Sequence, residues 1–252
     1  MPQLRISPAV EPLILVQQQL TLDAETTIVA ALFNARYDYA AKCFSGYAQH
    51  SNGTVQRVSL TLVHSQAARA ASDWIHGWIS ARQRDRLFDL AAQCPTEQAI
   101  VEIGSWKGKS TVILGWGSKS GNRAPVWAID PHEGTPLFWC MHTGGDVKNT
   151  AVQFLTNIDA AGVKDIVYPL IETGHSAAQA FSDPIGLLFV DGDHKYAAFD
   201  VRDWFPLIVA GGWLALHDSN IPAVSSTVAR LEAAGLVSDL ETIDSMMVMR
   251  KV

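Results

Sequence analysis

Residues 101–111 read VEIGSWKGKST. The apolar run 99–103 predicts a short strand that ends at Gly104, and the pattern beyond the turn predicts a helix from Lys109. Glycine lets the backbone approach a ligand closely, and the N–H groups at a helix N-terminus favour an anionic group. This segment is therefore predicted to bind a ligand at the end of a buried strand.

The spacing of the glycines separates three classes of ligand that use such a turn: dinucleotides, nucleoside triphosphates and S-adenosylmethionine. Gly104 and Gly108 form GxxxG, whereas the dinucleotide fingerprint is GxGxxG. Gly108-Lys109-Ser110 matches the end of a phosphate-binding loop, but Ile103 stands where that loop needs its first glycine. A loop that is one residue short cannot wrap a β-phosphate with successive N–H groups in the same way.

Two acidic residues favour S-adenosylmethionine. Glu102 lies just before the turn, and Asp130 ends the next predicted strand. A carboxylate at the end of that strand can accept hydrogen bonds from both ribose hydroxyls, as it does in dinucleotide-binding folds. The order of the strands predicts that both residues lie at the carboxyl edge of one sheet.

Outward from this turn, short apolar runs alternate with helix-like segments, which predicts an α/β fold. We expect a doubly wound, Rossmann-like, mostly parallel sheet with an antiparallel C-terminal edge hairpin. The predicted strands are 99–103, 126–129, 166–171, 187–190 and 213–216, followed by the hairpin strands 236–243 and 246–251. The predicted helices are 81–93 after an N-cap at Ser80, then the helix from Lys109, and 147–161, 195–209 and 224–234.

Residues 1–75 carry a weaker pattern and match no motif. We expect them to form an N-terminal appendage, either a lid or a dimerisation arm, and we expect the protein to be a homo-oligomer. Within the appendage, 24–33 is predicted to be helical and 54–63 to be a strand.

The composition predicts a globular protein with no nucleic-acid or membrane partner. Of 252 residues, 48% are hydrophobic and 17% are charged, and the formal net charge is −6. That balance provides no basic run for a non-specific nucleic-acid surface, and the apolar stretch 204–216 is too short and too broken to span a bilayer. Three separate cysteines, and no basic head before an apolar stretch at the N-terminus, predict a reduced, cytoplasmic protein.

Four motifs occur in order along the chain: VEIGSWKGKST at 101–111, WAIDPHEG at 127–134, LLFVDGDH at 187–194 and GGWLALHDS at 211–219. Together they resemble the class I S-adenosylmethionine-dependent methyltransferases, and most of all the small-molecule O-methyltransferases that carry DGDH and HD after the fourth and fifth strands. The segment 77–92 resembles the helix that precedes the first motif in that branch. The resemblance implies that residues 76–252 form an S-adenosylmethionine-binding methyltransferase domain.

The resemblance also implies a cofactor site. The glycine turn would pass beneath the methionine part of S-adenosylmethionine, Ser110 would reach its carboxylate, and Glu102 would lie near its amino group. Asp130 would bind the ribose hydroxyls, and the turn 174–176 would contact adenine, although many family members have an acidic residue in place of His175. The implied cofactor-binding residues are Glu102, Gly104, Ser105, Trp106, Gly108, Ser110, Asp130, His175, Ser176 and Asp191.

Asp191 and Asp218 end strands that are predicted to be neighbours, and neighbouring strands lie about 4.8 Å apart. Their carboxylates could therefore share one cation. In the metal-dependent O-methyltransferases the matching positions bind Mg²⁺, with Asn or Asp directly after the second aspartate, whereas this chain has Ser219 there and Asn220 one later. The predicted metal ligands are Asp191, Asp218 and Asn220, and a purely structural role for both aspartates stays open.

Methyl transfer to oxygen needs an aligned acceptor whose proton is removed. A cation would lower the pKa of the hydroxyl, and without one a histidine is the most suitable base. His194 is favoured because it lies on the loop after the fourth strand, whereas His217 is as readily a core histidine; Lys195 is a weaker candidate. The predicted catalytic residues are His194, Asp191 and His217.

The sequence thus predicts S-adenosylmethionine-dependent SN2 transfer of a methyl group to a hydroxyl of a small molecule, such as a sugar-bearing or aromatic natural product. The loop 131–146 is predicted to cover the acceptor, and Trp78 is predicted to lie in the core or at an interface.

Two alternative functions stay open. Gly108-Lys109-Ser110 would suit a protein that binds nucleoside triphosphates, and Ser219 would suit a cofactor-binding subunit without turnover.

Overall fold

The structure is a computed structural model. It describes the backbone of residues 18–21, 27–30, 33–38, 43–49, 55–60, 64–134 and 149–252, and the side chains of residues 68–134 and 149–252.

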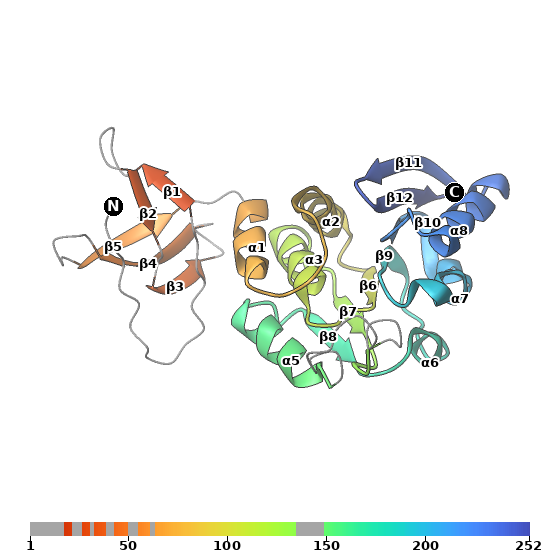
Figure 1. The fold of residues 1–252 in the computed structure, drawn as a ribbon, viewed down its shortest axis with the longest axis horizontal. Coiled ribbons are helices and arrows are strands. Elements are labelled where there is room, and N and C mark those ends of the chain that lie inside the picture. Colours follow the sequence, from red (N-terminus) through yellow and green to blue (C-terminus); the bar gives the residue numbers. More distant parts are fainter. Residues whose placement is uncertain are drawn as a thin grey trace.

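A seven-stranded sheet forms the centre of the molecule, with the order β11-β12-β10-β9-β6-β7-β8 (Figure 1). Its five parallel strands are β6 (Ala99–Ile103), β7 (Val126–Ile129), β8 (Val167–Leu170), β9 (Ile185–Val190) and β10 (Ile208–Leu216). The hairpin of β11 (Val237–Ile243) and β12 (Met246–Lys251) continues the sheet antiparallel to β10. The predicted doubly wound sheet with an antiparallel edge hairpin is confirmed.

The chain reverses its direction of travel across the sheet between β6 and β9. From β6 it proceeds outward to β7 and β8, and it then crosses back to place β9 beside β6 and β10 beside β9. In open α/β sheets, ligands bind at such a switch point, outside the carboxyl ends of the strands. The glycine turn after β6 and Asp191 after β9 both lie at this point, because Val190 pairs with Ile103.

Helices cover both faces of the sheet (Figure 1). The first face carries α1 (His64–Asp73), α2 (Ala81–Gln93), α3 (Lys109–Ser120) and α5 (Ala151–Ala160), and the second carries α6 (Gly174–Ala178), α7 (Ala197–Trp204) and α8 (Pro222–Ala233). Alternate side chains of β6 enter the two cores: Ile100 packs on the first face, and Val101 and Ile103 pack on the second. The sheet is therefore buried on both sides, which explains its continuous apolar runs.

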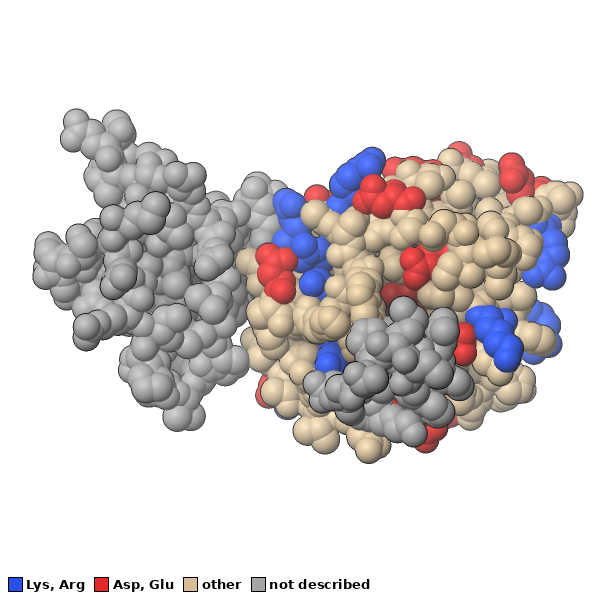
Figure 2. Space-filling model, viewed as in Figure 1, with Lys and Arg blue, Asp and Glu red and all other residues tan. Residues whose placement is uncertain are grey.

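Helix α2 begins as predicted. The Ser80 side chain accepts the Gln83 N–H, and the Gln83 side chain accepts the Ser80 N–H at 2.8 Å, which completes a capping box. Ion pairs of 2.8 and 3.0 Å join Arg86 to Glu241 and Arg82 to Asp244, and so connect α2 to the C-terminal hairpin. Figure 2 shows acidic and basic side chains interspersed over the described part of one face.

The N-terminal elements differ from one of the two predictions made for them. β1 (Gln18–Thr21) pairs with β2 (Thr27–Ala30), and β3 (Phe33–Asp38), β4 (Cys43–Gln49) and β5 (Val55–Leu60) form a second antiparallel sheet. The predicted strand 54–63 is confirmed by β5. The predicted helix 24–33 is wrong, because β2 and the start of β3 fall within it; a short apolar run does not distinguish the two structures by its periodicity.

Two predicted helices have different bounds. The segment 195–209 divides into η1 (His194–Tyr196), α7 and η2 (Phe205–Leu207), and Ile208 already begins β10. Pro206 lies in η2, where its missing N–H costs no helical hydrogen bond. The predicted helix 147–161 appears as α5, and residues 135–146 of the predicted acceptor loop 131–146 lie outside the described residues.

Among the described residues, no helix combines the length and the apolar composition that a bilayer crossing requires.

Candidate active site

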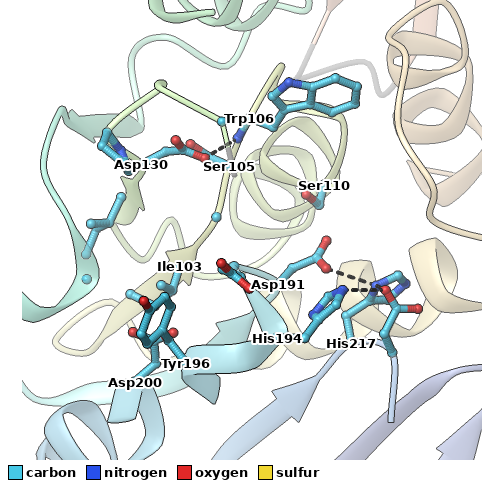
Figure 3. Close-up of a pocket in the computed structure, with 18 of the residues that line it drawn as sticks. Ile103, Ser105, Trp106, Ser110, Asp130, Asp191, His194, Tyr196, Asp200 and His217 are labelled. Atoms are coloured by element: carbon cyan, nitrogen blue, oxygen red, sulfur yellow. Dashed lines mark hydrogen bonds and ion pairs between the residues drawn. The ribbon is translucent and has the colours of Figure 1, made fainter. Parts of the chain in front are cut away.

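A cavity of about 720 Å³ opens at the carboxyl ends of β6, β7 and β9 (Figure 3). Most of the residues that the sequence predicts for the site line this cavity: Gly104, Ser105, Trp106, Ser110, Asp130, His175, Asp191, His194, His217 and Asp218. Four do not: Glu102, Gly108, Ser176 and Asn220. The fold thus brings together motifs that lie more than a hundred residues apart in the sequence.

The glycine turn lies directly against the turn that follows β9. Gly104 has φ +90°, in the left-handed region, and a Cβ added there would lie 2.5 Å from the carbonyl oxygen of Asp191 and 2.6 Å from the nitrogen of Gly192. Gly108, also left-handed at φ +89°, precedes the first residue of α3. Only a residue without a side chain lets the two turns meet, and this contact forms the floor of the cavity.

Asp130 holds the glycine turn from the side of β7. One of its carboxylate oxygens accepts the Trp106 N–H at 2.8 Å (Figure 3). The other accepts the His132 N–H at 2.6 Å. Each carboxylate oxygen has a second lone pair. Asp130 can therefore position the turn and still accept hydrogen bonds from a ligand in the cavity.

Glu102 lies behind the turn and is fully buried. It accepts hydrogen bonds from the hydroxyls of Ser110 and Thr111 at the start of α3. Burial raises the pKa of Glu102 to about 8, and the nearby charges of Asp191 and Asp130 raise it further, while the two hydroxyls act in the opposite direction. Glu102 therefore connects β6 to α3 as a largely protonated acid near neutral pH.

The raised pKa of Glu102 predicts how stability depends on pH. The folded protein holds the proton more tightly than the unfolded chain, in which the pKa is 4.5. This stabilisation is complete below pH 4.5 and is lost as the pH rises to about 8, by at most about 1.4 kcal/mol per pH unit. We expect Glu102→Gln to flatten the pH dependence of the free energy of unfolding over this interval, measured by urea denaturation. Glu97→Gln, at an exposed position, should leave the slope unchanged, and equal slopes in both variants would contradict the assignment.

Two histidines and two aspartates form a cluster at the ends of β9 and β10 (Figure 3). His217 Nδ1 lies 2.9 Å from Asp191 Oδ1 and 3.3 Å from Asp218 Oδ2. His194 Nε2 lies 2.9 Å from the same oxygen of Asp218. Asp218 is thus shared between a buried imidazole and a partly exposed one.

His217 is held in its protonated form. Its Nε2 lies 3.4 Å from Gln83 Oε1, and Gln83 is oriented because its Nε2 donates to Ile243 O and Ser245 Oγ. Both ring nitrogens therefore face oxygen acceptors. Burial alone would lower the pKa of His217, but Asp191 and Asp218 outweigh burial and raise it to about 10.

The pKa values of Asp218 and His194 shift in the directions that this pairing requires. Hydrogen bonds from His194 and His217 hold the pKa of Asp218 well below its usual value. The hydrogen bond to Asp218 raises the pKa of His194, although its partial burial and the charge of His217 oppose the change.

The predicted metal ligands fit Mg²⁺ poorly. One ligand atom each from Asp191, His217 and Asp218 lies within 4.8 Å of the others. However, His217 Nδ1 already lies between the two carboxylates, and Mg²⁺ prefers oxygen ligands. Asn220, the third predicted ligand, is exposed and does not line the cavity.

An aromatic wall closes the other end of the cavity, and the sequence did not predict it. The Trp78 and Trp106 rings stack with centroids 5.0 Å apart and planes 5° apart, and His76 meets both rings edge-on. Trp78 was predicted to lie in the core or at an interface; it is 52% exposed, so the core position is wrong and an interface position stays a prediction.

Comparison with known proteins agrees with this architecture. Residues 101–219 match a family model described as a methyltransferase domain. The chain is similar in structure to the O-methyltransferase NovP (16% identity, 70% of this chain and 82% of that chain, TM-score 0.59). It is also similar to the O-methyltransferase from Bacillus cereus in complex with S-adenosylhomocysteine (19% identity, 75% of this chain and 89% of that chain, TM-score 0.52). A third similar structure is the O-methyltransferase TomG from Streptomyces achromogenes in complex with S-adenosylmethionine (18% identity, 75% of this chain and 88% of that chain, TM-score 0.50).

At these identities the structural likeness concerns the fold, whereas the family match covers the strands and turns that build the cavity. Residues 101–219, a little under half of the chain, are therefore similar to a methyltransferase domain.

Proposed function

We propose that this protein transfers the methyl group of S-adenosylmethionine to a hydroxyl of a small molecule, with His194 as the general base. The observation that carries the proposal is the pair formed by His194 and Asp218, 2.9 Å apart, in the same cavity as the glycine turn. Methyl transfer from a sulfonium needs little of the protein beyond alignment of the acceptor and removal of its proton.

The cavity fits the cofactor. Its volume of about 720 Å³ lies within the usual range for ligand sites. The buried Ser105 hydroxyl lines the cavity and has no hydrogen-bond partner among the described residues, so it is available to a ligand. Bound there, S-adenosylmethionine supplies an electrophilic methyl group. The Asp130 carboxylate would accept the ribose hydroxyls, and the Gly104 turn would support the methionine part.

His194 is suited to take the proton of the acceptor hydroxyl. Asp218 accepts a hydrogen bond from Nε2–H, which leaves Nδ1 as the basic nitrogen of the neutral ring. The negative charge of Asp218 also stabilises the imidazolium that forms when the proton is taken, as in other Asp–His pairs. His217 is unsuited to this role, because its pKa of about 10 keeps it protonated near neutral pH. Its charge instead holds Asp191 and Asp218 in place.

We further propose that a metal ion is not required for deprotonation. A protonated His217 places one positive charge between Asp191 and Asp218, at the position where Mg²⁺ would place two. The magnesium alternative requires that His217 release its proton to solvent or move away from the two carboxylates, so that their oxygens can bind the ion.

The acceptor is proposed to be a ring-bearing small molecule. The exposed face of Trp78, stacked on Trp106, offers an apolar plane on which an aromatic ring or a sugar can pack. TomG, a structurally similar protein, is involved in tomaymycin synthesis. A natural product with a free hydroxyl is the class of acceptor that this surface favours.

Calorimetry with S-adenosylhomocysteine, and an assay of methyl transfer from labelled S-adenosylmethionine to hydroxylated aromatic and sugar compounds, test the proposal. We expect binding, and turnover that changes less than about twofold in excess EDTA. No binding at millimolar S-adenosylhomocysteine would contradict the cofactor assignment. Turnover that requires added Mg²⁺ would contradict the metal-independent route.

The other predictions have their own tests. A nucleoside-triphosphate site would give protection against thermal unfolding by Mg-nucleotide that Lys109→Ala abolishes, and a subunit without turnover would bind S-adenosylhomocysteine but methylate no acceptor. The homo-oligomeric state and the role of residues 1–75 as a lid or dimerisation arm stay predictions that light scattering of the full chain and of a chain lacking those residues would test. The cytoplasmic location likewise stays a prediction.

A further inference from the structure

Asp200, in the first turn of α7, brings a carboxylate to the end of the cavity away from the aromatic wall. A Cβ added at Gly174 would lie 2.9 Å from Asp200 Oδ1, and one added at Gly192 would lie 3.7 Å from Oδ2. Asp200, Gly174 and Gly192 all line the cavity. The absence of side chains at both glycines leaves the carboxylate open to a ligand.

Contacts between α7 and α6 fix this position. Trp204, one turn beyond Asp200, donates its indole N–H to Gly174 O at 2.9 Å. His175 Nδ1 bonds Asp203 Oδ2 at 2.7 Å. These contacts hold α7 against the start of α6, so that Asp200, one turn earlier on α7, meets Gly174.

The Asp200 carboxylate has no hydrogen bond or ion pair among the described residues, although it is half-buried. Burial, and then the negative charges of Asp203 and Asp193, raise its pKa to about 6, while His175 acts weakly in the opposite direction. A half-buried carboxylate among like charges is stabilised by a hydrogen-bond donor, and the protein's described residues do not supply one. The donor is therefore expected from a ligand.

The polar side chains that the sequence predicted for adenine are engaged elsewhere. The His175 ring bonds Asp203, and the Ser176 hydroxyl donates to Glu172 at 2.8 Å. Asp200 lies instead at the same turn, next to Ile103 and Tyr196 and apart from His217 (Figure 3). Ile103 Cγ2 lies 3.0 Å from the Cβ position of Gly174, so an apolar surface adjoins the carboxylate.

Taken with the proposed binding of ribose by Asp130, this arrangement places a planar base beyond the ribose, over Ile103 and against Gly174. We propose that Asp200 accepts a hydrogen bond from the exocyclic amino group of adenine and makes the site select adenine over hypoxanthine. This inference rests on the proposed function. Adenine presents an N–H donor at this edge, whereas hypoxanthine presents a carbonyl oxygen that an ionised carboxylate repels.

The test measures the affinity of the whole protein for S-adenosylhomocysteine and for S-inosylhomocysteine by calorimetry at pH 8. The wild type should prefer the adenine compound by at least about tenfold, as expected for a hydrogen bond to a charged group. Asp200→Asn should bring this preference to within about threefold, because an amide can donate to the hypoxanthine oxygen as well as accept from the adenine amino group. Asp159→Asn, an equal change of charge at an exposed position on α5, should leave the preference unchanged.

Each outcome decides between the proposals. A wild type that binds S-adenosylhomocysteine but does not discriminate overturns the role of Asp200 and leaves the proposed function intact, and this measurement needs no variant to fold. The same holds if Asp200→Asn keeps the wild-type preference. A wild type that binds neither compound overturns both proposals.

Discussion

Replacing His194 by alanine should lower kcat by about a hundredfold to ten-thousandfold while the affinity for S-adenosylhomocysteine changes little. A positioned general base contributes a factor of this size, and His194 contacts Asp218 rather than the glycine turn that supports the cofactor. The measurement is steady-state kinetics with an acceptor found in the labelled-methyl assay, together with calorimetry of the same variant.

The pH profile separates a base from a merely structural histidine. The base must be neutral to take a proton, and Asp218 raises the pKa of His194 above 6.5. The wild-type kcat should therefore rise with pH through a midpoint above 6.5 and then level off, and this limb should disappear in His194→Ala. Lys195→Ala, one position along and exposed, should stay within about twofold of the wild type. A His194→Ala enzyme with full kcat would place the base elsewhere.

Replacing Gly104 by alanine should remove measurable binding of S-adenosylhomocysteine and lower the free energy of unfolding by several kcal/mol. The added Cβ would lie 2.5 and 2.6 Å from backbone atoms of Asp191 and Gly192, so the turns after β6 and β9 would have to separate. Neither backbone can move without breaking the pairing of Ile103 with Val190 in the centre of the sheet. Calorimetry and urea denaturation measure the two effects.

Gly211 provides the matched control. It also has a left-handed backbone, with φ +77°, but a Cβ added there would meet nothing within 4 Å. Gly211→Ala should therefore show only the conformational cost of a side chain in this region, about 1–2 kcal/mol, with unchanged cofactor affinity. If Gly104→Ala is no worse than Gly211→Ala, the contact between the two turns is not what shapes the cavity.

The predicted fold agreed with the structure wherever a pattern was local. The strand before Gly104, the Ser80 cap and the C-terminal hairpin each depend on a few consecutive residues, whose periodicity and turn chemistry determine them. The predicted helix 24–33 failed because a short apolar run suits either structure until it finds a partner, and here Thr27–Ala30 pairs with β1.

The motifs that carry the candidate catalytic residues are likewise made of consecutive residues, but the residues that contact them lie elsewhere in the chain. Asp191, His194 and Asp218 stand in the recognisable motifs DGDH and HD, whereas the Nε2 atom of His217 faces Gln83, which is distant in the chain. Asp200 carried no signal of its own, because its place against Gly174 follows from how α7 packs on α6 through Trp204.

The sequence by itself determined the order of strands, the glycine turn and the acidic and imidazole groups that end the strands, because these are properties of neighbouring residues. Only the tertiary structure decided which of those groups already have a hydrogen-bond or charge partner within the protein. The charge of His217 is used to neutralise Asp191 and Asp218, the Ser110 hydroxyl is used by Glu102, and Asp200 remains without a partner among the described residues. Hydrogen bonds and charges satisfy one another across the packed core, and that assignment of partners exists only once the chain has folded.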